Sequence, residues 1–395
     1  MELDPIHLDN AATSHPKPTG VAEAVVRHLT DIGASPGRGG YLGTVQSQAV
    51  LDRLRTRLRR LCNAPGPDER MLFTLNGTDA LNLAIRGLAL PRLLRGEPVR
   101  VVATDLEHNS VIRPFRTLEA LGAEVVFVPL DPTTGAANPN RLAEALTPET
   151  TLCAAVHGSN VTGATQPLAD YGAAAKKHQV PFLVDASQTF GRIPIDVESM
   201  GIDLLAFSGH KYLLGPLGTG GLWAREGIDL MPIRDGGTGS MSELETQPDC
   251  WPDRYEPGSH NTSGLFGLDA ALDWIERQTV EGLATQEAKV HQQIAECIDR
   301  TPGLRRLGPN APQLGTFALE HDDYDAATLA AIMDSHFGLH VRAGLHCAPR
   351  VHDQLGTTNQ GGSVRLSLGS TMPEHTVERL EFALEALGGN PVGAL

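Results

Sequence analysis

A lysine that could carry covalent chemistry follows a predicted strand in the segment IDLLAFSGHKYLLGPLGTGG. The apolar strand Leu204–Phe207 ends there, and Ser208, His210 and Lys211 come next in a predicted turn. Ligands of open α/β sheets bind beyond the carboxyl ends of the strands. A lysine in that place can have its pKa lowered by burial and can form a Schiff base. An ordinary surface lysine in a loop explains this segment equally well when it is taken alone.

An acidic residue occupies a similar place in the segment VPFLVDASQTFG. Asp185 follows the predicted strand Phe182–Val184, and Gln188 comes three residues later. A single aspartate at the end of a strand is often only a helix cap or a turn residue. In enzymes that use pyridoxal phosphate (PLP), however, a carboxylate pairs with the pyridinium nitrogen of the cofactor. A lysine and an aspartate at the ends of two strands suit that cofactor.

A possible phosphate site lies upstream, in the segment FTLNGTDALNLAI. A predicted strand, Met71–Leu75, leads through Gly77, Thr78 and Asp79 into a predicted helix over Thr78–Leu88. The free backbone N–H groups at the start of a helix, together with a threonine hydroxyl, can bind a phosphate without a lysine. A helix with an ordinary cap is an equally good interpretation of this motif alone.

Two more residues could belong to the same site. His108, in DLEHNSVIRPF, follows the predicted strand Val99–Ala103. A single histidine is more often structural, but this one could stack on the ring of a cofactor. Cys347, in VRAGLHCAP, lies beside His346 and near Arg342, a setting that favours a reactive thiolate. The other cysteines (Cys62, Cys153, Cys250 and Cys297) are interpreted as structural.

The elements that would position these residues alternate between short apolar runs and helical patterns. This alternation predicts βαβ units and a mostly parallel sheet covered by helices, an α/β fold. After about Gly264 the strands become sparser, which predicts a second, smaller α+β domain. We therefore expect a large domain over residues 17–263 and a small one over 264–395, with residues 1–16 packing nearby. Strands are expected at Leu314–Leu319, His340–Arg342 and Ser363–Leu368 of the small domain.

The composition excludes several classes of protein. The 395 residues carry 32 basic and 47 acidic side chains, a net charge of −15, which argues against a nucleic-acid or anionic membrane surface. No stretch approaches the ~18 apolar residues of a membrane span. No spacing of ligands indicates a metal site. Five scattered cysteines without a CxxC pair, and a start without the features of a secretory signal, favour the reducing cytoplasm.

Taken together, the segments resemble the class V aminotransferase family, which has fold type I of the PLP enzymes. Within that family they are most similar to the cysteine desulfurase and selenocysteine lyase group, and the SGHK and RAGLHC segments look most like its Suf-type (group II) branch. The resemblance covers almost the whole chain and rests on these motifs, in this order: LDNAATSHPKP, NGTDALN, EHNS, HGSNVTG, VDASQ, SGHK, PGSHNT, RAGLHC and VRLSLG.

The resemblance implies a role for each matching residue. Lys211 would bind PLP covalently, Asp185 would pair with the ring nitrogen, Gln188 would bond the phenolate oxygen, and His108 would stack on the ring. Asn160 and Arg365 would orient the substrate carboxylate, and Cys347 would take the sulfur. The phosphate and its surroundings would be held by Gly77, Thr78, Asp79, Ser208 and His210, and by Ser259 of a neighbouring subunit.

The resulting expectation is a cytoplasmic, homodimeric cysteine desulfurase that converts L-cysteine to L-alanine and passes sulfur through a persulfide on Cys347 to an acceptor protein, as in iron–sulfur cluster assembly. A selenocysteine lyase, another PLP-dependent C–S lyase or a different class V aminotransferase is the alternative. An inactive sulfur-carrier subunit is a further one, but the pair of Asp185 and Lys211 argues against it. No nucleic acid, membrane or metal is expected as a partner.

Overall fold

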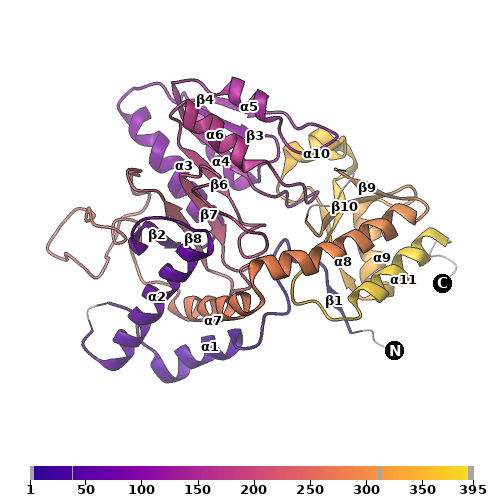
Figure 1. Ribbon diagram of the computed structural model, residues 1–395, viewed down its shortest axis with the longest axis horizontal. Coiled ribbons are helices and arrows are strands. Elements are labelled where there is room, and N and C mark those ends of the chain that lie inside the picture. Colours follow the sequence, from indigo (N-terminus) through magenta and orange to yellow (C-terminus); the bar gives the residue numbers. More distant parts are fainter. Residues whose placement is uncertain (1–3, 38, 310–313, 390–395) are drawn as a thin grey trace.

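The chain folds into a large and a small part joined by one long helix. The computed structural model describes residues 4–37, 39–309 and 314–389. In Figure 1 the large part lies to the left and the small part to the right, where both ends of the chain also lie. The predicted class, an α/β fold of the PLP type I kind with a mostly parallel central sheet, is confirmed by the arrangement described below.

The large part is built on a sheet of seven strands in the order β2-β8-β7-β6-β5-β3-β4. Strand β8 runs antiparallel to both of its neighbours, and the other pairs are parallel. The bounds are β2 Met71–Thr74, β3 Arg100–Thr104, β4 Glu124–Val128, β5 Thr150–Val156, β6 Phe182–Asp185, β7 Leu204–Ser208 and β8 Gly220–Ala224.

These strands form because their apolar runs are buried on both faces of the sheet. Strand β5, TTLCAAV, is buried at every residue, which is typical of a central parallel strand. Successive side chains point to opposite faces. Cys153 and Ala155 therefore belong to one hydrophobic cluster, whereas Leu152 and Ala154 belong to another on the far side.

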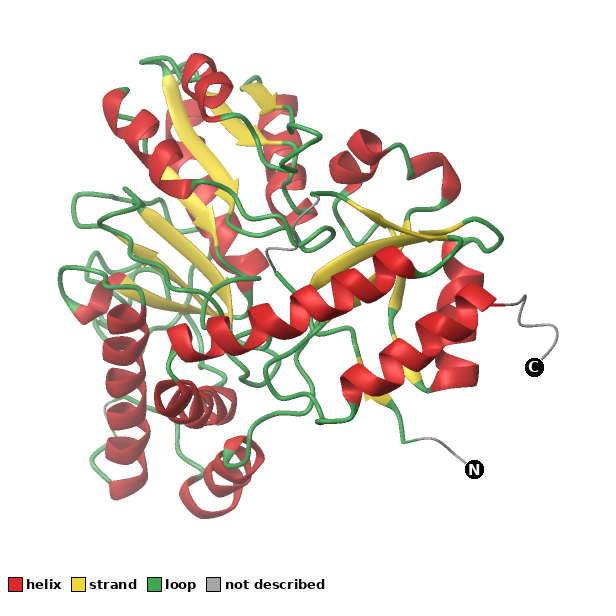
Figure 2. Cartoon of the chain, turned by 45° about the vertical axis from the view of Figure 1, so that its right-hand side comes forward, coloured by secondary structure: helices red, strands yellow, loops and turns green. Residues whose placement is uncertain are grey.

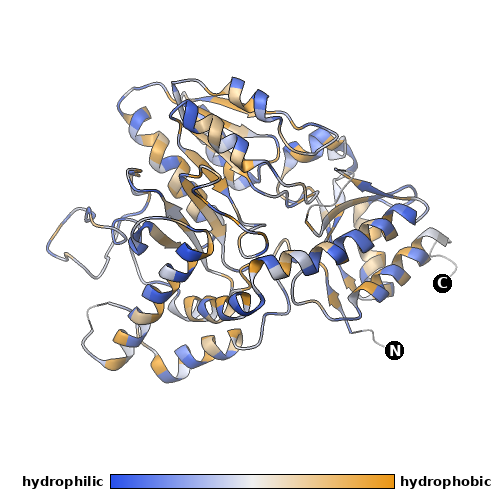
Figure 3. Ribbon diagram, in the orientation of Figure 1, coloured by the Kyte–Doolittle hydropathy of each residue, from blue (hydrophilic) through white to orange (hydrophobic). Residues whose placement is uncertain are grey.

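Helices cover both faces, as Figure 2 shows, and their apolar sides pack on the sheet, as Figure 3 shows. One face carries α3 (Gly77–Leu94) and α4 (Asn109–Ala120), which share a cluster with alternate strand residues. The other face carries the helices α2 Leu42–Leu61, α5 Pro139–Ala145, α6 Leu168–Lys177 and α7 Thr262–Gln278. Helix α1 (Val21–Arg27) packs against α7 and leads into a π-helical turn at His28–Ile32.

The small part has an antiparallel sheet in the order β12-β13-β10-β9. Its apolar face packs against three helices in a separate cluster. The elements are α8 Val280–Arg300, β9 Leu304–Leu307, β10 Thr316–His321, α9 Ala326–Phe337, β11 Leu339–His340, β12 Arg342–Gly344, α10 Pro349–Leu355, β13 Ser363–Ser367 and α11 Thr376–Gly389. The N-terminal strand β1 (Ile6–His7) pairs in parallel with β11.

Two details of the small part differ from the expectation. The predicted strand His340–Arg342 is split, because β11 pairs with β1 whereas β12 pairs with β13 in the other sheet. Helix α7, placed in the second domain by its position after Gly264, packs in the core of the large sheet through residues such as Leu268 and Ile275. We therefore propose that the division falls within α8, whose first turns contact that core and whose last turns contact the small one. Residues 1–3, 310–313 and 390–395 of the predicted domains lie outside the described residues.

Two features are absent from residues 4–37, 39–309 and 314–389. None of their helices is long and apolar enough to cross a membrane. No group of three His, Cys, Asp or Glu side chains within these ranges could hold a metal ion.

Candidate active site

The carboxyl ends of the central strands bring most of the predicted residues into one pocket. Asp185 is the last residue of β6 and Ser208 the last of β7, and these two strands are neighbours. Parallel strands place their carboxyl ends at the same edge of a sheet, which explains the convergence. The pocket is lined by Thr78, His108, Ser110, Val156, Asn160, Asp185, Ser187, Gln188, Ser208 and Lys211.

Lys211 is one of the residues that line this pocket. Burial lowers the pKa of Lys211 to about 8, because the ammonium ion loses its hydration. The carboxylate of Asp185 opposes this shift, and the guanidinium of Arg365 adds to it. A lysine with this pKa is partly uncharged near neutral pH, as attack on an aldehyde requires.

Asp185 lines the same pocket. Its side chain is buried, and the backbone N–H of Ser187 donates to Oδ1 at 2.9 Å. Burial raises the pKa of Asp185, while the bonds from Ser187 and the charge of Lys211 lower it. The ionised form of such a carboxyl group is stabilised by a nearby positive charge, which Lys211 or a protonated ring nitrogen can supply.

His108 contributes a flat, uncharged ring to the wall of the pocket. It caps the N-terminus of α4, where its Nδ1 accepts a hydrogen bond from the backbone N–H of Ser110 at 3.1 Å. Burial, followed by the charge of Lys211, lowers the pKa of His108 to about 3. The ring is therefore neutral at physiological pH, and since Nδ1 accepts, Nε2 carries the proton.

The N-terminus of α3 forms the end of the pocket where a phosphate was expected. The side chain of Asn76 caps this helix by accepting from the N–H of Asp79 at 2.9 Å. A Cβ atom on Gly77 would lie 2.7 Å from the hydroxyls of both Ser187 and Ser208. An alanine at this position would force the hydroxyls or the first turn of the helix to move, because the two hydroxyls approach that turn so closely.

Two predicted phosphate residues lie away from this pocket lining. The carboxylate of Asp79 accepts from the N–H of Leu75 at 3.0 Å and from Arg234 at 3.1 Å. It therefore holds the turn at the start of α3. His210 is anchored through its carbonyl, which accepts from the N–H of Ser14 at 3.1 Å, and its buried Nδ1 has no protein partner among the described residues.

Gln188 lines the pocket, and only one end of its side-chain amide is hydrogen-bonded within the described residues. Its Nε2 donates to the carbonyl of Ala11 at 3.0 Å, which ties the N-terminal segment to the large part. Its Oε1 is buried and has no partner among the described residues. A buried polar atom without a partner is costly, so the amide is suited to bind a polar ligand in the pocket.

A hydrogen bond joins Arg365 to Asn160, the two residues expected to bind the substrate carboxylate. The Nη1 of Arg365 donates to the carbonyl of Asn160 at 3.1 Å, and its Nη2 pairs with the carboxylate of Asp9. Burial lowers the pKa of Arg365, while Asp9 opposes this shift. The buried Nε of Arg365 has no protein partner among the described residues, so the guanidinium can still bind an anion.

Cys347 presents an exposed, free thiol close to this pocket. Its charge acts on the pKa of Lys211, and its carbonyl accepts from the N–H of Asn109 at 2.7 Å, the residue after His108. The other free cysteines are buried or half-buried. An exposed free thiol whose charge acts on Lys211 suits the predicted role of sulfur acceptor.

The expected contribution of His346 to a thiolate at Cys347 is wrong. His346 is buried, and its Nε2 donates to the carbonyl of Ser363 at 3.0 Å. Burial, followed by the charge of Arg365, lowers the pKa of His346 to about 3. The ring is therefore neutral, and the positive charges that act on it are those of Arg365 and Arg342.

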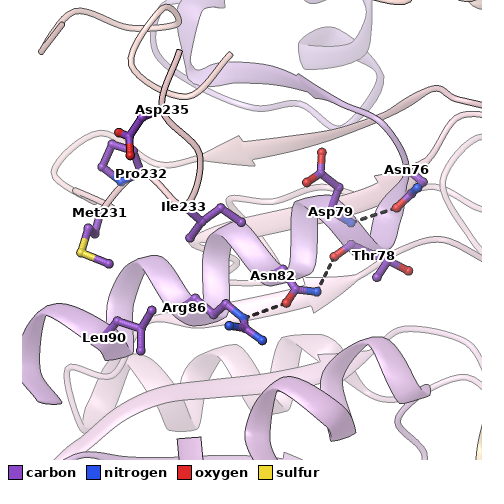
Figure 4. A pocket seen from close by; sticks show the side chains of 10 residues that line it. All are labelled: Asn76, Thr78, Asp79, Asn82, Arg86, Leu90, Met231, Pro232, Ile233 and Asp235. Atoms are coloured by element: carbon purple, nitrogen blue, oxygen red, sulfur yellow. Dashed lines mark hydrogen bonds between the residues drawn. The ribbon is translucent and has the colours of Figure 1, made fainter. Parts of the chain in front are cut away.

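Ser259 does not line the pocket within a single chain. It is exposed and lines a separate cavity between α2 and the loop that follows β8. The buried ion pair of Arg55 with Glu256, at 2.6 Å, fixes the chain three residues before it. A groove does reach Thr78 from outside, between α3 and the segment Met231–Asp235, as Figure 4 shows.

Sequence reasoning did not single out some residues that the pocket contains. Ser110, Val156 and Ser187 line it, and Asp9 binds Arg365. Ser110 and Ser187 lie within the motifs EHNS and VDASQ, so the motifs could have indicated them. Asp9 is 356 positions away from Arg365 in the chain, and no local pattern signals that contact.

The chain is similar along its length to curated cysteine desulfurases. It is 29% identical to a probable cysteine desulfurase of Methanothermobacter thermautotrophicus over 391 residues, which cover 98% of this chain and 95% of the relative. It is 32% identical to a probable cysteine desulfurase of Xylella fastidiosa over 387 residues, which cover 96% and 90%.

Solved structures have the same fold. The apo cysteine desulfurase of Thermococcus onnurineus superposes with a TM-score of 0.89 at 29% identity, over 97% of this chain and 94% of that one. The cysteine desulfurase CsdA of Escherichia coli superposes with a TM-score of 0.85 at 26% identity, over the same shares of the two chains. Residues 6–380 match the aminotransferase class V family. The chain therefore belongs to the class V aminotransferase family of PLP-dependent enzymes.

Proposed function

We propose that this chain is a PLP-dependent cysteine desulfurase that converts L-cysteine to L-alanine and takes the sulfur onto Cys347. The observation that carries the proposal is the meeting of three groups at one pocket. The amine of Lys211 lies with the buried carboxyl group of Asp185, and the exposed thiol of Cys347 is close enough for its charge to act on Lys211. The names of the relatives described above support the same activity.

The residues present fit PLP. The unpartnered Oε1 of Gln188 can bond a polar group of the cofactor, and the turn at Gly77 is free of side-chain atoms beside the two serine hydroxyls. Lys211 would bind the aldehyde carbon, Asp185 the ring nitrogen, and His108 one face of the ring. Thr78 and Ser208 would hold the phosphate, with the helix start of α3.

PLP, when bound, withdraws electrons from the substrate carbons and so allows charge to develop at Cα and Cβ. Lys211 acts as the base that takes the proton from Cα and returns it. Its lowered pKa suits this task, since an efficient acid–base catalyst titrates near the working pH. Asn160 and Arg365 fix the substrate carboxylate and so set the direction of the Cα–H bond.

The thiolate of Cys347 then attacks the sulfur of the substrate. A new S–S bond forms on Cys347, and the bond between Cβ and sulfur breaks. The electron pair of the broken bond passes to Cβ, where a proton completes the methyl group of alanine. The enzyme is left with a persulfide, whose outer sulfur can pass to an acceptor.

The active unit is a homodimer in which Ser259 reaches the phosphate of the partner subunit. Three features support this arrangement: Ser259 is exposed, it lies outside its own pocket, and an open groove leads along α3 to Thr78. The ion pair of Arg55 and Glu256 would keep the Ser259 segment in place for that contact. Most homo-oligomers of this kind have two-fold symmetry, so each subunit would complete the site of the other.

The partner in sulfur transfer is an acceptor protein, as used in iron–sulfur cluster assembly. The short segment around Cys347 supports the Suf-type branch of the desulfurases, and the five free cysteines support a reducing cytoplasm as the place of action. The exposed position of Cys347 supports direct contact with the acceptor.

The test is the product balance of the PLP-loaded enzyme with L-cysteine and a thiol reductant. The proposal requires one alanine for each sulfide. Lys211→Ala should lower the rate by at least about a hundredfold, whereas Lys176→Ala, on the exposed end of α6, should not change it. Pyruvate and ammonia in place of alanine would show a C–S lyase that releases sulfur by elimination, and would contradict the proposal.

A further inference from the structure

The backbone on both sides of the Cys347 thiol is held by the large part of the molecule. The side-chain amide of Asn160 donates to the carbonyl of His346 at 2.7 Å. The backbone N–H of Asn109 donates to the carbonyl of Cys347 at 2.7 Å. Asn160 lies in the loop that follows β5, and Asn109 is the first residue of α4, next to His108, so the cysteine is tied to the wall of the pocket.

A third attachment lies in the helix that begins two residues after the cysteine. Arg350 of α10 donates from Nε to Oδ1 of Asp105 at 2.6 Å, and Gln354 donates to Oδ2 at 3.2 Å. Asp105 is 2% exposed and follows strand β3. The guanidinium of Arg350 also lies 4.2 Å from the centre of the Phe127 ring. One buried carboxylate thus binds two side chains of α10.

The conformation at the thiol itself needs such support. His346 and Cys347 have φ angles of 49° and 58°, in the left-handed region that residues with a Cβ rarely adopt. Two such residues in succession persist only where the surrounding structure holds them. The next residue, Ala348, is fully buried in a small cluster with Leu106 and Val351, which lie beside Asp105 and Arg350 in the chain.

We propose that Asp105 is a positioning residue for sulfur transfer: through Arg350 and Gln354 it holds α10, and so it holds the thiol of Cys347 at the mouth of the Lys211 pocket. The inference rests on the proposed desulfurase function and extends it to residues outside the pocket lining. A thiolate must approach the substrate sulfur along one line. A misplacement of about 1 Å can cost about a hundredfold in rate.

Two substrates separate positioning of the thiol from general damage to the site. L-cysteine needs the attack of Cys347 on its sulfur. β-Chloro-L-alanine needs no thiol, because it loses its Cα proton to Lys211 and then chloride, and water converts the remaining product to pyruvate and ammonium. Loss of the Asp105 contact should therefore lower the turnover of L-cysteine and leave the turnover of β-chloro-L-alanine unchanged.

The variants are Asp105→Asn, which removes the charge, and Arg350→Met, which removes the charge but keeps an apolar stem against Phe127. In each, kcat for L-cysteine should fall about tenfold or more at unchanged KM, because substrate binding by Arg365 is not touched. Turnover of β-chloro-L-alanine should stay within about twofold. The double variant should be no slower than Asp105→Asn alone, since Arg350→Met removes an ion pair that Asp105→Asn has already removed.

Arg116→Met is the matched control. Arg116 lies over the same Phe127 ring, at 5.3 Å, but its ion partner is the exposed Glu119 of its own helix, at 2.8 Å. This variant should leave turnover of both substrates unchanged. If Asp105→Asn does not fold, the turnover of the two substrates is compared in Arg350→Met and Gln354→Ala instead.

A measurement that needs no turnover tests the positioning of Cys347 separately from the proposed function. In PLP-free protein, deuterium uptake over residues 345–357 and alkylation of Cys347 by iodoacetamide should both be faster in Asp105→Asn than in the wild type. Unchanged uptake, or an equal loss of turnover with the two substrates, would overturn the positioning role. Failure of the wild type to form alanine from L-cysteine would instead overturn the proposed function.

Discussion

Gly77 lies against the hydroxyl of Ser208, so that a methyl group on Gly77 would be 2.7 Å from that oxygen. The same methyl group would be 2.7 Å from the hydroxyl of Ser187. The contact joins the start of α3 to the end of β7, three residues before Lys211. The place that would hold a phosphate is therefore formed by the close approach of two backbone segments.

We expect Gly77→Ala to weaken PLP binding while the protein stays folded. Forcing a methyl group into a packed site costs about 1–3 kcal/mol, which corresponds to roughly 5- to 150-fold in affinity. The measurement is a titration of PLP-free protein with PLP, followed by fluorescence. Gly40→Ala is the control, because a Cβ there meets no atom within 4 Å. Equal PLP affinity of wild type and Gly77→Ala would contradict the proposed phosphate site.

The rate at which PLP-free protein captures PLP should follow the titration of Lys211. Only the neutral amine attacks the aldehyde, and the pKa of Lys211 is lowered to about 8 by burial. The rate should rise as the pH increases through 8 and level off above it. Stopped-flow absorbance on both sides of this pH checks the profile, with Lys211→Ala as the blank.

Asp185→Asn should move that profile to lower pH. The carboxylate of Asp185 raises the pKa of Lys211, so its removal leaves burial and the charge of Arg365 to lower it further. A profile that moves to higher pH, or that keeps its midpoint, would show that the two groups do not interact as described.

Glu107 should make the stability of the PLP-free protein depend on pH. It is fully buried, and its Oε1 accepts from the hydroxyl of Thr104 at 2.6 Å and from the N–H of Val156 at 3.0 Å. Burial raises the pKa of Glu107 to about 8, well above the value of about 4.3 in an unfolded chain. The unfolded state therefore ionises first, and stability is lost as the pH rises from about 4 to 8, by up to about 1.4 kcal/mol per unit.

The check is urea unfolding of wild type and Glu107→Gln at several pH values. The free energy of unfolding of the wild type, relative to the variant, should fall through this window and stay level above pH 8. Glu198→Gln, at an exposed position, should show no such trend. A constant difference between wild type and Glu107→Gln would mean that the buried carboxyl group is already ionised below pH 7.

Much of the fold could be predicted because its strands are short apolar runs that end at polar or turn-forming residues. The strand predicted at Leu204–Phe207 is β7, Leu204–Ser208, and the strand predicted at Val99–Ala103 is β3, Arg100–Thr104. Asp185 and Lys211 could be brought together from sequence because each follows a buried strand, and such strand ends share one edge of a sheet.

The features that the sequence does not predict depend on contacts between distant residues, which no local sequence pattern indicates. The pairing of Asp9 with Arg365 and of Asp105 with Arg350 joins positions hundreds of residues apart. The neutral state of His346 follows from its burial against Ser363, which the adjacent cysteine does not reveal. The packing of α7 on the large sheet likewise depends on tertiary contacts of an amphipathic helix, whose pattern does not specify its partner.

The most direct test of the central claim is a single turnover of L-cysteine labelled with ³⁵S, followed by mapping of the label by mass spectrometry of the peptides. We expect the sulfur on Cys347 in the wild type, in an amount equal to the alanine formed. Cys347→Ser should still bind PLP and show a spectral change with L-cysteine, but should transfer almost no sulfur, since a hydroxyl is a poor nucleophile toward sulfur. Cys250→Ser, at a half-buried cysteine, should behave as the wild type. Label on another cysteine, or alanine formed at the wild-type rate by Cys347→Ser, would contradict the account.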